Sequence, residues 1–102
     1  MKISIITIAF NSENTISHTI ESVLAQSFLQ LSGTELEYLI IDGASKDATV
    51  EVAERYRAEF ERKGASYRII SEPDGGIYDA MNKGIRLATG DVIGILNSDD
   101  WY

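Results

Sequence analysis

The sequence predicts an α/β fold in which a mainly parallel sheet is flanked by helices. Two observations lead to this prediction. Short apolar segments rich in isoleucine and valine alternate with longer segments whose apolar residues repeat at helical spacing. Most of the apolar segments are followed by a turn that contains glycine, asparagine or aspartate. Alternation of this kind favours parallel strands joined by right-handed crossovers.

The first two strand–helix pairs follow from the first part of the chain. Residues 3–8 are apolar and mostly β-branched, which predicts a strand, and capping residues at 11–14 precede a helix over 16–28. A second strand is predicted over 36–41. A second helix is expected over 50–60, and its inner face is formed by Val50, Ala53, Arg57 and Phe60.

The last part of the chain predicts a third pair and a fourth strand. Residues 67–71 form a short strand, and the turn at 72–76 leads into a helix over 77–88. Gly90 stands where a helix C-terminal cap belongs. Residues 92–96 are apolar throughout, so this segment is predicted to be a buried strand.

Length and composition exclude several classes of protein. A chain of 102 residues makes one small domain, and its net charge of −7 would repel a nucleic acid. No run of 18 apolar residues is present, so no transmembrane segment is expected. The absence of cysteine excludes disulfides, a thiol nucleophile and a thiolate zinc site. These features fit a cytoplasmic protein.

Acidic residues are expected to converge at one edge of the sheet. Asp99 and Asp100 come just after the predicted fourth strand, and Asp42 and Asp74 follow the second and third strands. The loops after parallel strands gather at the edge where open α/β sheets bind ligands. Paired carboxylates suit Mg²⁺ or Mn²⁺, which usually bind together with substrate phosphates. The alternative is that Asp99 and Asp100 cap a helix.

Five blocks of sequence carry a resemblance to a known family. In chain order they are IITIAFNSE (5–13), IDGASKD (41–47), DGGIYDAMNKG (74–84), ATGD (88–91) and LNSDDW (96–101). In this order and spacing they resemble family 2 glycosyltransferases, which have the Rossmann-like GT-A fold. The third block is most similar to bacterial enzymes of exopolysaccharide, capsule and O-antigen assembly. The resemblance covers essentially all of the chain.

The resemblance implies an inverting transfer of a sugar from a nucleotide-diphosphate donor, often a UDP-sugar, with Mg²⁺ or Mn²⁺ as cofactor. The acceptor would be a saccharide or a lipid-linked saccharide, and the full-length enzyme would then work at the inner face of the membrane. Residues 1–102 would form the donor-binding half. The catalytic base and the acceptor site are expected downstream, so no residue of this chain is predicted to be catalytic.

The resemblance also assigns roles to individual residues. Asp99 and Asp100 would hold the cation, and one of them would touch the ribose of the nucleotide. The remaining predicted contacts to the nucleotide are Ile8 and Ala9 through their backbone, Phe10 stacked on the base, Asp42 against the base, and Glu13 and Asp79 in less defined roles. Many family members have an acid where Gly43 and Asn97 stand here.

Several of these residues also have a purely structural interpretation. Phe10 could belong to the core, Asp42 could form a turn, and Asp79 could favour the dipole of its helix. Lys83 and Arg86 could meet a diphosphate, but solvent exposure is the expected state for both.

Two other classes of protein compete with the glycosyltransferase interpretation. A receiver-type signalling domain has a similar fold but carries its acidic pair after the first strand, where Phe10 and Asn11 stand here. A non-catalytic binding or assembly module would use its exposed apolar surface, including Trp101 and Tyr102, to form a homodimer.

Overall fold

The computed structural model describes residues 1–25 and 35–96 of the chain. It confirms an α/β fold built on a mainly parallel sheet. The elements, in chain order, are β1 (Lys2–Ala9), α1 (Ile16–Leu24), β2 (Glu35–Asp42), α2 (Thr49–Glu54), α3 (Arg57–Arg62), β3 (Ser66–Ser71), α4 (Ile77–Leu87) and β4 (Val92–Ile95). Part of the predicted first helix, including Phe28, and the predicted sites at Asp99 and Asp100 lie outside the described residues.

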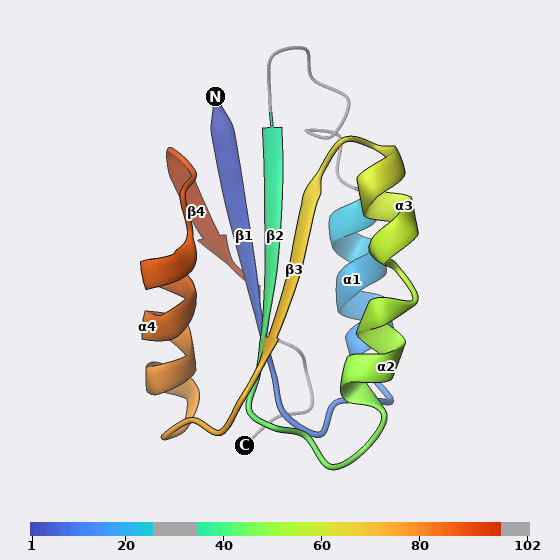
Figure 1. The fold of residues 1–102 in the computed structure, drawn as a ribbon, viewed down its shortest axis with the longest axis vertical. Coiled ribbons are helices and arrows are strands. Elements are labelled where there is room, and N and C mark those ends of the chain that lie inside the picture. The colour runs from blue at the N-terminus through green and yellow to red at the C-terminus, as the bar shows by residue number, and fades with distance from the viewer. Residues whose placement is uncertain (26–34, 97–102) are drawn as a thin grey trace.

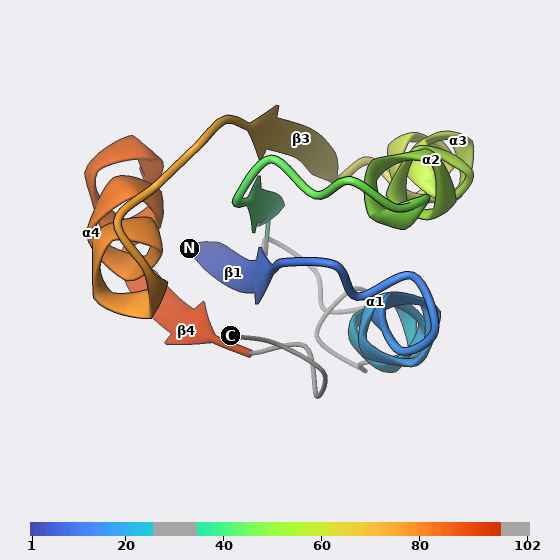
Figure 2. The same cartoon turned by 90° about the horizontal axis from the view of Figure 1, so that it is seen from below.

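The four strands form one parallel sheet in the order β3-β2-β1-β4 (Figure 1). The central strand β1 pairs Ile3 with Leu36 on one side and with Val92 on the other. Helices α1, α2 and α3 lie on one face of the sheet and α4 on the opposite face (Figure 2). None of the helices within residues 1–25 and 35–96 combines the length and apolar character of a membrane span.

Because side chains alternate along a strand, β1, β2 and β3 contribute to two apolar clusters, one on each face of the sheet. The cluster beneath α1, α2 and α3 has Tyr38 and Ile40 of β2 at its centre. Tyr38, Phe60 and Tyr67 pack as an aromatic group there, with ring centroids 4.8 to 5.7 Å apart. The cluster beneath α4 consists of Ile6, Ile8, Leu39, Ile41 and Ala80.

The predicted helix over 50–60 is instead two short helices, α2 and α3, and the expectation of one continuous helix was wrong. The break lies at Arg55 and Tyr56, whose backbone N–H groups donate to the carbonyls three residues earlier. The carbonyl of Ala53 also accepts a hydrogen bond of 2.6 Å from the buried hydroxyl of Tyr67. Tyr67 therefore draws this carbonyl toward β3, which favours a tight turn over a continuous helix at this point.

The prediction that the fourth strand is buried was also wrong. Val92, Ile93 and Ile95 expose 39% to 49% of their surface. β4 pairs with β1 only, and α4 packs on β1 and β2. Within the described part of the chain, both faces of β4 therefore lack a covering layer, although its composition is that of an interior strand.

A buried carboxylate ties the α4–β4 connection to the amino-terminal end of the sheet. Glu37 of β2 is 4% exposed and accepts hydrogen bonds from Ser4 Oγ (2.7 Å), the Thr89 backbone N–H (2.9 Å) and Thr89 Oγ1 (3.2 Å). The Nζ atom of Lys2 lies 3.8 Å away. Burial alone would raise the pKa of the Glu37 carboxyl, but these hydrogen bonds and the ammonium group hold it below its usual range.

Candidate functional site

The sheet has a change of strand order at β1, and this change positions the candidate site. The chain runs outward from β1 through β2 to β3, and then crosses to the far side of β1 to form β4. The helices on the two sides of this point lie on opposite faces of the sheet (Figure 2). In open α/β sheets, ligands bind beyond the carboxyl ends of the strands at such a switch point. Here it lies between the ends of β1 and β4.

The predicted nucleotide residues Ile8, Ala9 and Phe10 are found at the carboxyl end of β1, beside this switch point. The side chains of Ile8 and Ala9 are buried, 1% and 0% exposed, so their backbone is what a ligand at the strand end could reach. Phe10 is half-buried, and its backbone N–H donates to the hydroxyl of Ser12 (3.2 Å). The stacking role of Phe10 remains a prediction.

The loop after β1 and the loop after β2 are joined by hydrogen bonds. The Asn11 N–H donates to Ser45 Oγ (2.7 Å), and Asn11 Oδ1 accepts from the Lys46 N–H (2.9 Å). The Ser12 N–H donates to Thr49 Oγ1 (2.7 Å). These bonds connect segments about 35 residues apart in sequence and make residues 10–15 and 43–48 a single structural unit, hereafter the joined loops.

Glu13 contributes to the same unit. Its N–H donates to Asp47 Oδ2 (3.2 Å), and its Oε2 accepts from the Ala48 N–H (3.3 Å). Asp47 also accepts from the N–H and hydroxyl of Thr49. Partial burial acts to raise the pKa of Asp47, but the hydrogen bonds from Thr49 and Glu13 hold it below its usual range. Glu13 thus has a clear structural role here, and its predicted contact to the nucleotide remains a prediction.

Two residues of the joined loops adopt left-handed backbone conformations. Asn11 has φ +50° and Ala44 has φ +62°. Asparagine tolerates this region, but alanine is strained there because its Cβ approaches the following carbonyl. Ala44 directly precedes Ser45 in the sequence, and the Asn11 N–H donates to the Ser45 hydroxyl. The Ser45 N–H donates to Asp42.

Asp42 ends β2 with its side chain fully enclosed. Its exposed fraction is 0%, and its carboxylate accepts hydrogen bonds from the Ser45 N–H (2.9 Å), Ser45 Oγ (2.5 Å) and Ser71 Oγ (2.8 Å). Its carbonyl accepts from the Glu72 N–H (3.0 Å). The predicted contact to the nucleobase remains a prediction, whereas the links to β3 and to the joined loops are present in the structure.

Gly43, the position where the family resemblance leads us to expect an acid, lies next to the end of β1. Its N–H donates to the Ala9 carbonyl (3.0 Å), which extends the pairing of β1 and β2 by one bond. Gly43 is buried. The only side chain atom at this position is a hydrogen, so no carboxylate from position 43 borders the predicted base site.

The remaining described site residue, Asp79, lies in the first turn of α4, next to the loop that follows β3. Its Oδ2 accepts from the Gly75 N–H (2.8 Å), and Asp74 Oδ1 accepts from the Gly76 N–H (3.1 Å). Gly76 has φ +114°, a conformation that favours glycine. Asp79 shapes the entry into α4, on the opposite face of the sheet from α1, and its contact to a nucleotide remains a prediction.

The expectation of a solvent-exposed Lys83 was wrong. The residue is 8% exposed, and its Nζ lies 3.0 Å from Oε1 of Glu72, at the end of β3. α4 presents Ala80, Lys83 and Gly84 to the sheet, so the lysine stem is enclosed and only the ion pair reaches toward solvent. Arg86 is exposed, as expected.

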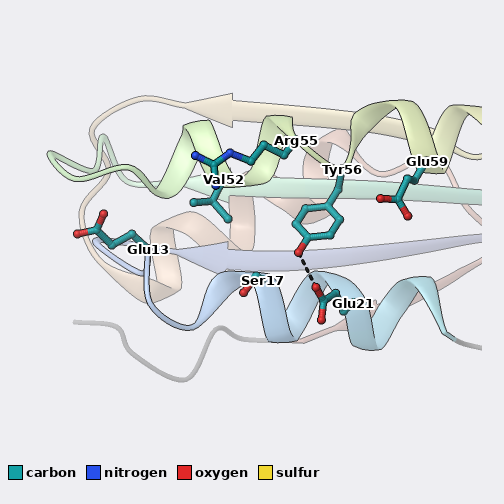
Figure 3. A pocket seen from close by; sticks show the side chains of 7 residues that line it. All are labelled: Glu13, Ser17, Glu21, Val52, Arg55, Tyr56 and Glu59. Carbon is teal, nitrogen blue, oxygen red and sulfur yellow. Dashed lines mark hydrogen bonds between the residues drawn. The ribbon is translucent and has the colours of Figure 1, made fainter.

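A groove with a volume of 520 Å³ lies between α1 and the α2–α3 pair (Figure 3). Tyr56 donates a hydrogen bond of 2.6 Å to Glu21 across it. The lining residues are Glu13, Ser17, Glu21, Val52, Arg55, Tyr56 and Glu59. Three carboxylates against one guanidinium would repel a diphosphate, so this groove is unsuited to a nucleotide-sugar.

The metal ligands predicted from sequence, Asp99 and Asp100, lie outside the described residues. Within the described ranges, no group of three or more histidine, cysteine, aspartate or glutamate side chains is arranged to hold a metal ion. The structure also reveals residues that the sequence interpretation missed, namely Ser45, Ser71 and Thr49. Ser45 could have been found from its position three residues after Asp42, because a serine hydroxyl at this spacing often forms hydrogen bonds with the nearby carboxylate and backbone groups.

Comparison with known proteins gives consistent matches over nearly the whole chain. The model of the family described as Glycosyl transferase family 2 matches residues 4–102. An uncharacterized glycosyltransferase of Mycobacterium tuberculosis is 41% identical over 100 residues, covering 98% of this chain and 34% of the relative.

Two solved structures are similar to this chain. TarS of Staphylococcus aureus, residues 1–349 in complex with UDP-GlcNAc, has a TM-score of 0.77 at 28% identity, over 99% of this chain and 27% of that one. A mannosyltransferase of Pyrobaculum calidifontis, in complex with GDP-Man and Mn²⁺, has a TM-score of 0.79 at 23% identity, over 98% and 28% of the two chains. The chain therefore spans about a third or less of the length of these proteins.

Proposed function

The chain belongs to glycosyl transferase family 2, and we propose that it forms the donor-binding part of an inverting glycosyltransferase. The donor is a nucleotide-diphosphate sugar, with a UDP-sugar as the specific proposal. The acceptor is a saccharide or a lipid-linked saccharide of bacterial polysaccharide synthesis. The catalytic base and acceptor site belong to sequence beyond these 102 residues.

The observation that carries this proposal is the pair of joined loops beside the switch point of the sheet. The loops after β1 and β2 are held together by hydrogen bonds before any ligand arrives. A preformed site loses less conformational entropy on binding than a flexible one. The half-buried Phe10 belongs to this unit, and an aromatic side chain next to the end of β1 suits a nucleobase.

The proposed metal ligands are Asp99 and Asp100, which follow β4 in the sequence. Leu96 is held next to β1 by a hydrogen bond from its N–H to the Ile6 carbonyl (2.8 Å). Two carboxylates are suitable hard ligands for Mg²⁺ or Mn²⁺. A bound cation would neutralise charge on the leaving diphosphate. The Mn²⁺ complex of the Pyrobaculum mannosyltransferase supports the choice of ion.

Calorimetric titration with UDP tests this proposal. We expect binding in the presence of Mn²⁺ and its loss when EDTA replaces the metal. Asp99→Ala should abolish the metal-dependent binding, whereas Glu51→Gln on the exposed surface of α2 should leave it unchanged. Equal UDP affinity with and without Asp99 would refute the assignment of the metal site.

The exposed apolar residues of β4 favour one alternative, a module whose role is assembly. Sedimentation analysis of the same sample separates the two functions. A stable dimer with no affinity for UDP would support the assembly module, and metal-dependent UDP binding would support the glycosyltransferase.

A further inference from the structure

From the enclosed carboxylate of Asp42, we infer that this residue positions the nucleotide subsite and does not contact the base. Its side chain holds the joined loops and the end of β3 in place. The inference deepens the proposed function and rests on it for the identity of the ligand.

The first argument is the occupancy of the carboxylate. An ionised carboxylate offers about four lone-pair directions. Three are taken by the Ser45 N–H, the Ser45 hydroxyl and the Ser71 hydroxyl, at 2.5 to 2.9 Å. The residue is 0% exposed. A nucleobase N–H would have to displace a serine and open the loop before it could reach an oxygen of Asp42.

The second argument is a relay through Ser45. Its single hydroxyl proton is donated to Asp42 Oδ1 (2.5 Å), which leaves its lone pairs to accept the Asn11 N–H (2.7 Å). Asn11 has the left-handed φ of +50° and directly follows Phe10. A charged acceptor strengthens the hydrogen bonds of the donor attached to it. Asp42 therefore fixes the loop after β1 as well as its own.

The third argument is the convergence of three strand ends on this residue. Ser71 at the end of β3 donates to Asp42 Oδ2, and the Glu72 N–H donates to the Asp42 carbonyl. The adjacent Gly43 N–H donates to the Ala9 carbonyl at the end of β1. Removing the charge of Asp42 should therefore loosen every segment that borders the proposed base site, whichever base is bound.

Asp42→Asn distinguishes positioning from base contact when UDP and CDP are titrated side by side in Mn²⁺. Uracil N3 carries a hydrogen and cytosine N3 does not, so a base-reading carboxylate favours UDP. An amide at position 42 can accept from uracil or donate to cytosine, so the preference for UDP would be lost. For a positioning residue, we expect both affinities to fall together by about tenfold, with their ratio unchanged within about twofold. A ratio that shifts by about tenfold toward CDP overturns the inference.

Amide hydrogen exchange supplies a readout that does not depend on nucleotide. In Asp42→Asn we expect the amides of Asn11 and Ser45 to exchange at least about tenfold faster, while those in the middle of β2 keep their protection. Unchanged exchange at Asn11 overturns the relay. Wild type that binds neither nucleotide would count against the proposed function, and this exchange measurement would still decide the role of Asp42.

Variants of Ser45 keep the inference falsifiable if Asp42→Asn fails to fold. Ser45→Ala removes the hydroxyl that links Asp42 to Asn11 and should reproduce the faster exchange at Asn11. Ser45→Thr retains a hydroxyl and should restore slow exchange. Equal behaviour of the two variants overturns the relay, and Glu51→Gln serves as a surface control in both measurements.

Discussion

Glu37→Gln removes a carboxylate that is buried at the amino-terminal end of the sheet, while preserving the size of the side chain. Three hydrogen bonds from Ser4 and Thr89 end on this carboxylate. Glutamine keeps one acceptor oxygen, but it introduces an N–H₂ group beside the Thr89 hydroxyl and the Lys2 ammonium. Hydrogen bonds to a charged group contribute about 1.5 to 3 kcal/mol to stability, more than neutral ones.

We therefore expect Glu37→Gln to lower the free energy of unfolding by about 2 kcal/mol at pH 7. For a domain of this length, that change corresponds to a fall of about 8 °C in Tm. Urea unfolding followed by circular dichroism measures the effect. Glu35→Gln, on the same strand but exposed, is the matched control and should change stability by less than about 0.5 kcal/mol.

The effect should also depend on pH with a defined sign. The pKa of Glu37 is below its usual range in the folded protein. Its contribution is therefore fully present above the unfolded pKa of about 4.3 and is lost as the pH falls through the folded value. The difference between wild type and Glu37→Gln should shrink on acidification. A difference that is negligible at pH 7, or one that stays constant down to pH 3, would refute this account of the carboxylate.

Three further substitutions test other parts of the structure. Gly90→Ala should destabilise the protein by about 1 to 3 kcal/mol in urea unfolding, because the new Cβ would lie 2.5 Å from Ser4 Oγ and 2.7 Å from Ser4 N. Ala44→Gly should raise the free energy of unfolding by about 0.5 to 1 kcal/mol, since φ is +62° there. Tyr67→Phe should cost about 1 kcal/mol in the same assay through loss of the bond to the Ala53 carbonyl.

Two of these substitutions have matched controls. Ala58→Gly, on the exposed side of α3, should destabilise by about 1 kcal/mol, opposite in sign to Ala44→Gly. Tyr78→Phe, at a residue 79% exposed, should have no measurable effect beside Tyr67→Phe. If Gly90→Ala left the free energy of unfolding unchanged, the backbone at Ser4 would have to shift easily. Such a shift would contradict the expectation that pairing within the sheet holds Ser4 in place.

The strands and their order of alternation with helices were predictable because they depend on local pattern. Residues 3–8 and 36–41 are largely apolar segments, and both are interior strands of the observed sheet. The break after Glu54 was not predictable, since it depends on the hydroxyl of Tyr67, a residue from another element. The exposure of β4 was missed because the apolar composition of a strand shows only that it is suited to burial. Whether the strand is buried depends on the elements that pack against it.

The candidate site was predictable in position but not in its internal bonding. That Ala9 and Asp42 end adjacent strands follows from the alternation of elements. That Asp42 is enclosed by Ser45 and Ser71 depends on rotamers and on the register of β3, which no local pattern encodes. The burial of Lys83 was missed for a similar reason, because its partner Glu72 lies at the end of another strand.

Among the helices that the structure describes, only α4 lies on its face of the sheet, and this placement has a consequence during protein synthesis. Strands β1, β2 and β3 can pair once residue 71 has left the ribosome, but the apolar side of that sheet, with Ile6, Leu39 and Ile41, is covered only by residues 77–87. Translation at about 5 to 20 residues per second leaves this surface uncovered for about a second or more. During this interval the nascent chain exposes an apolar surface to which chaperones can bind. The surface is covered when α4 packs against the sheet.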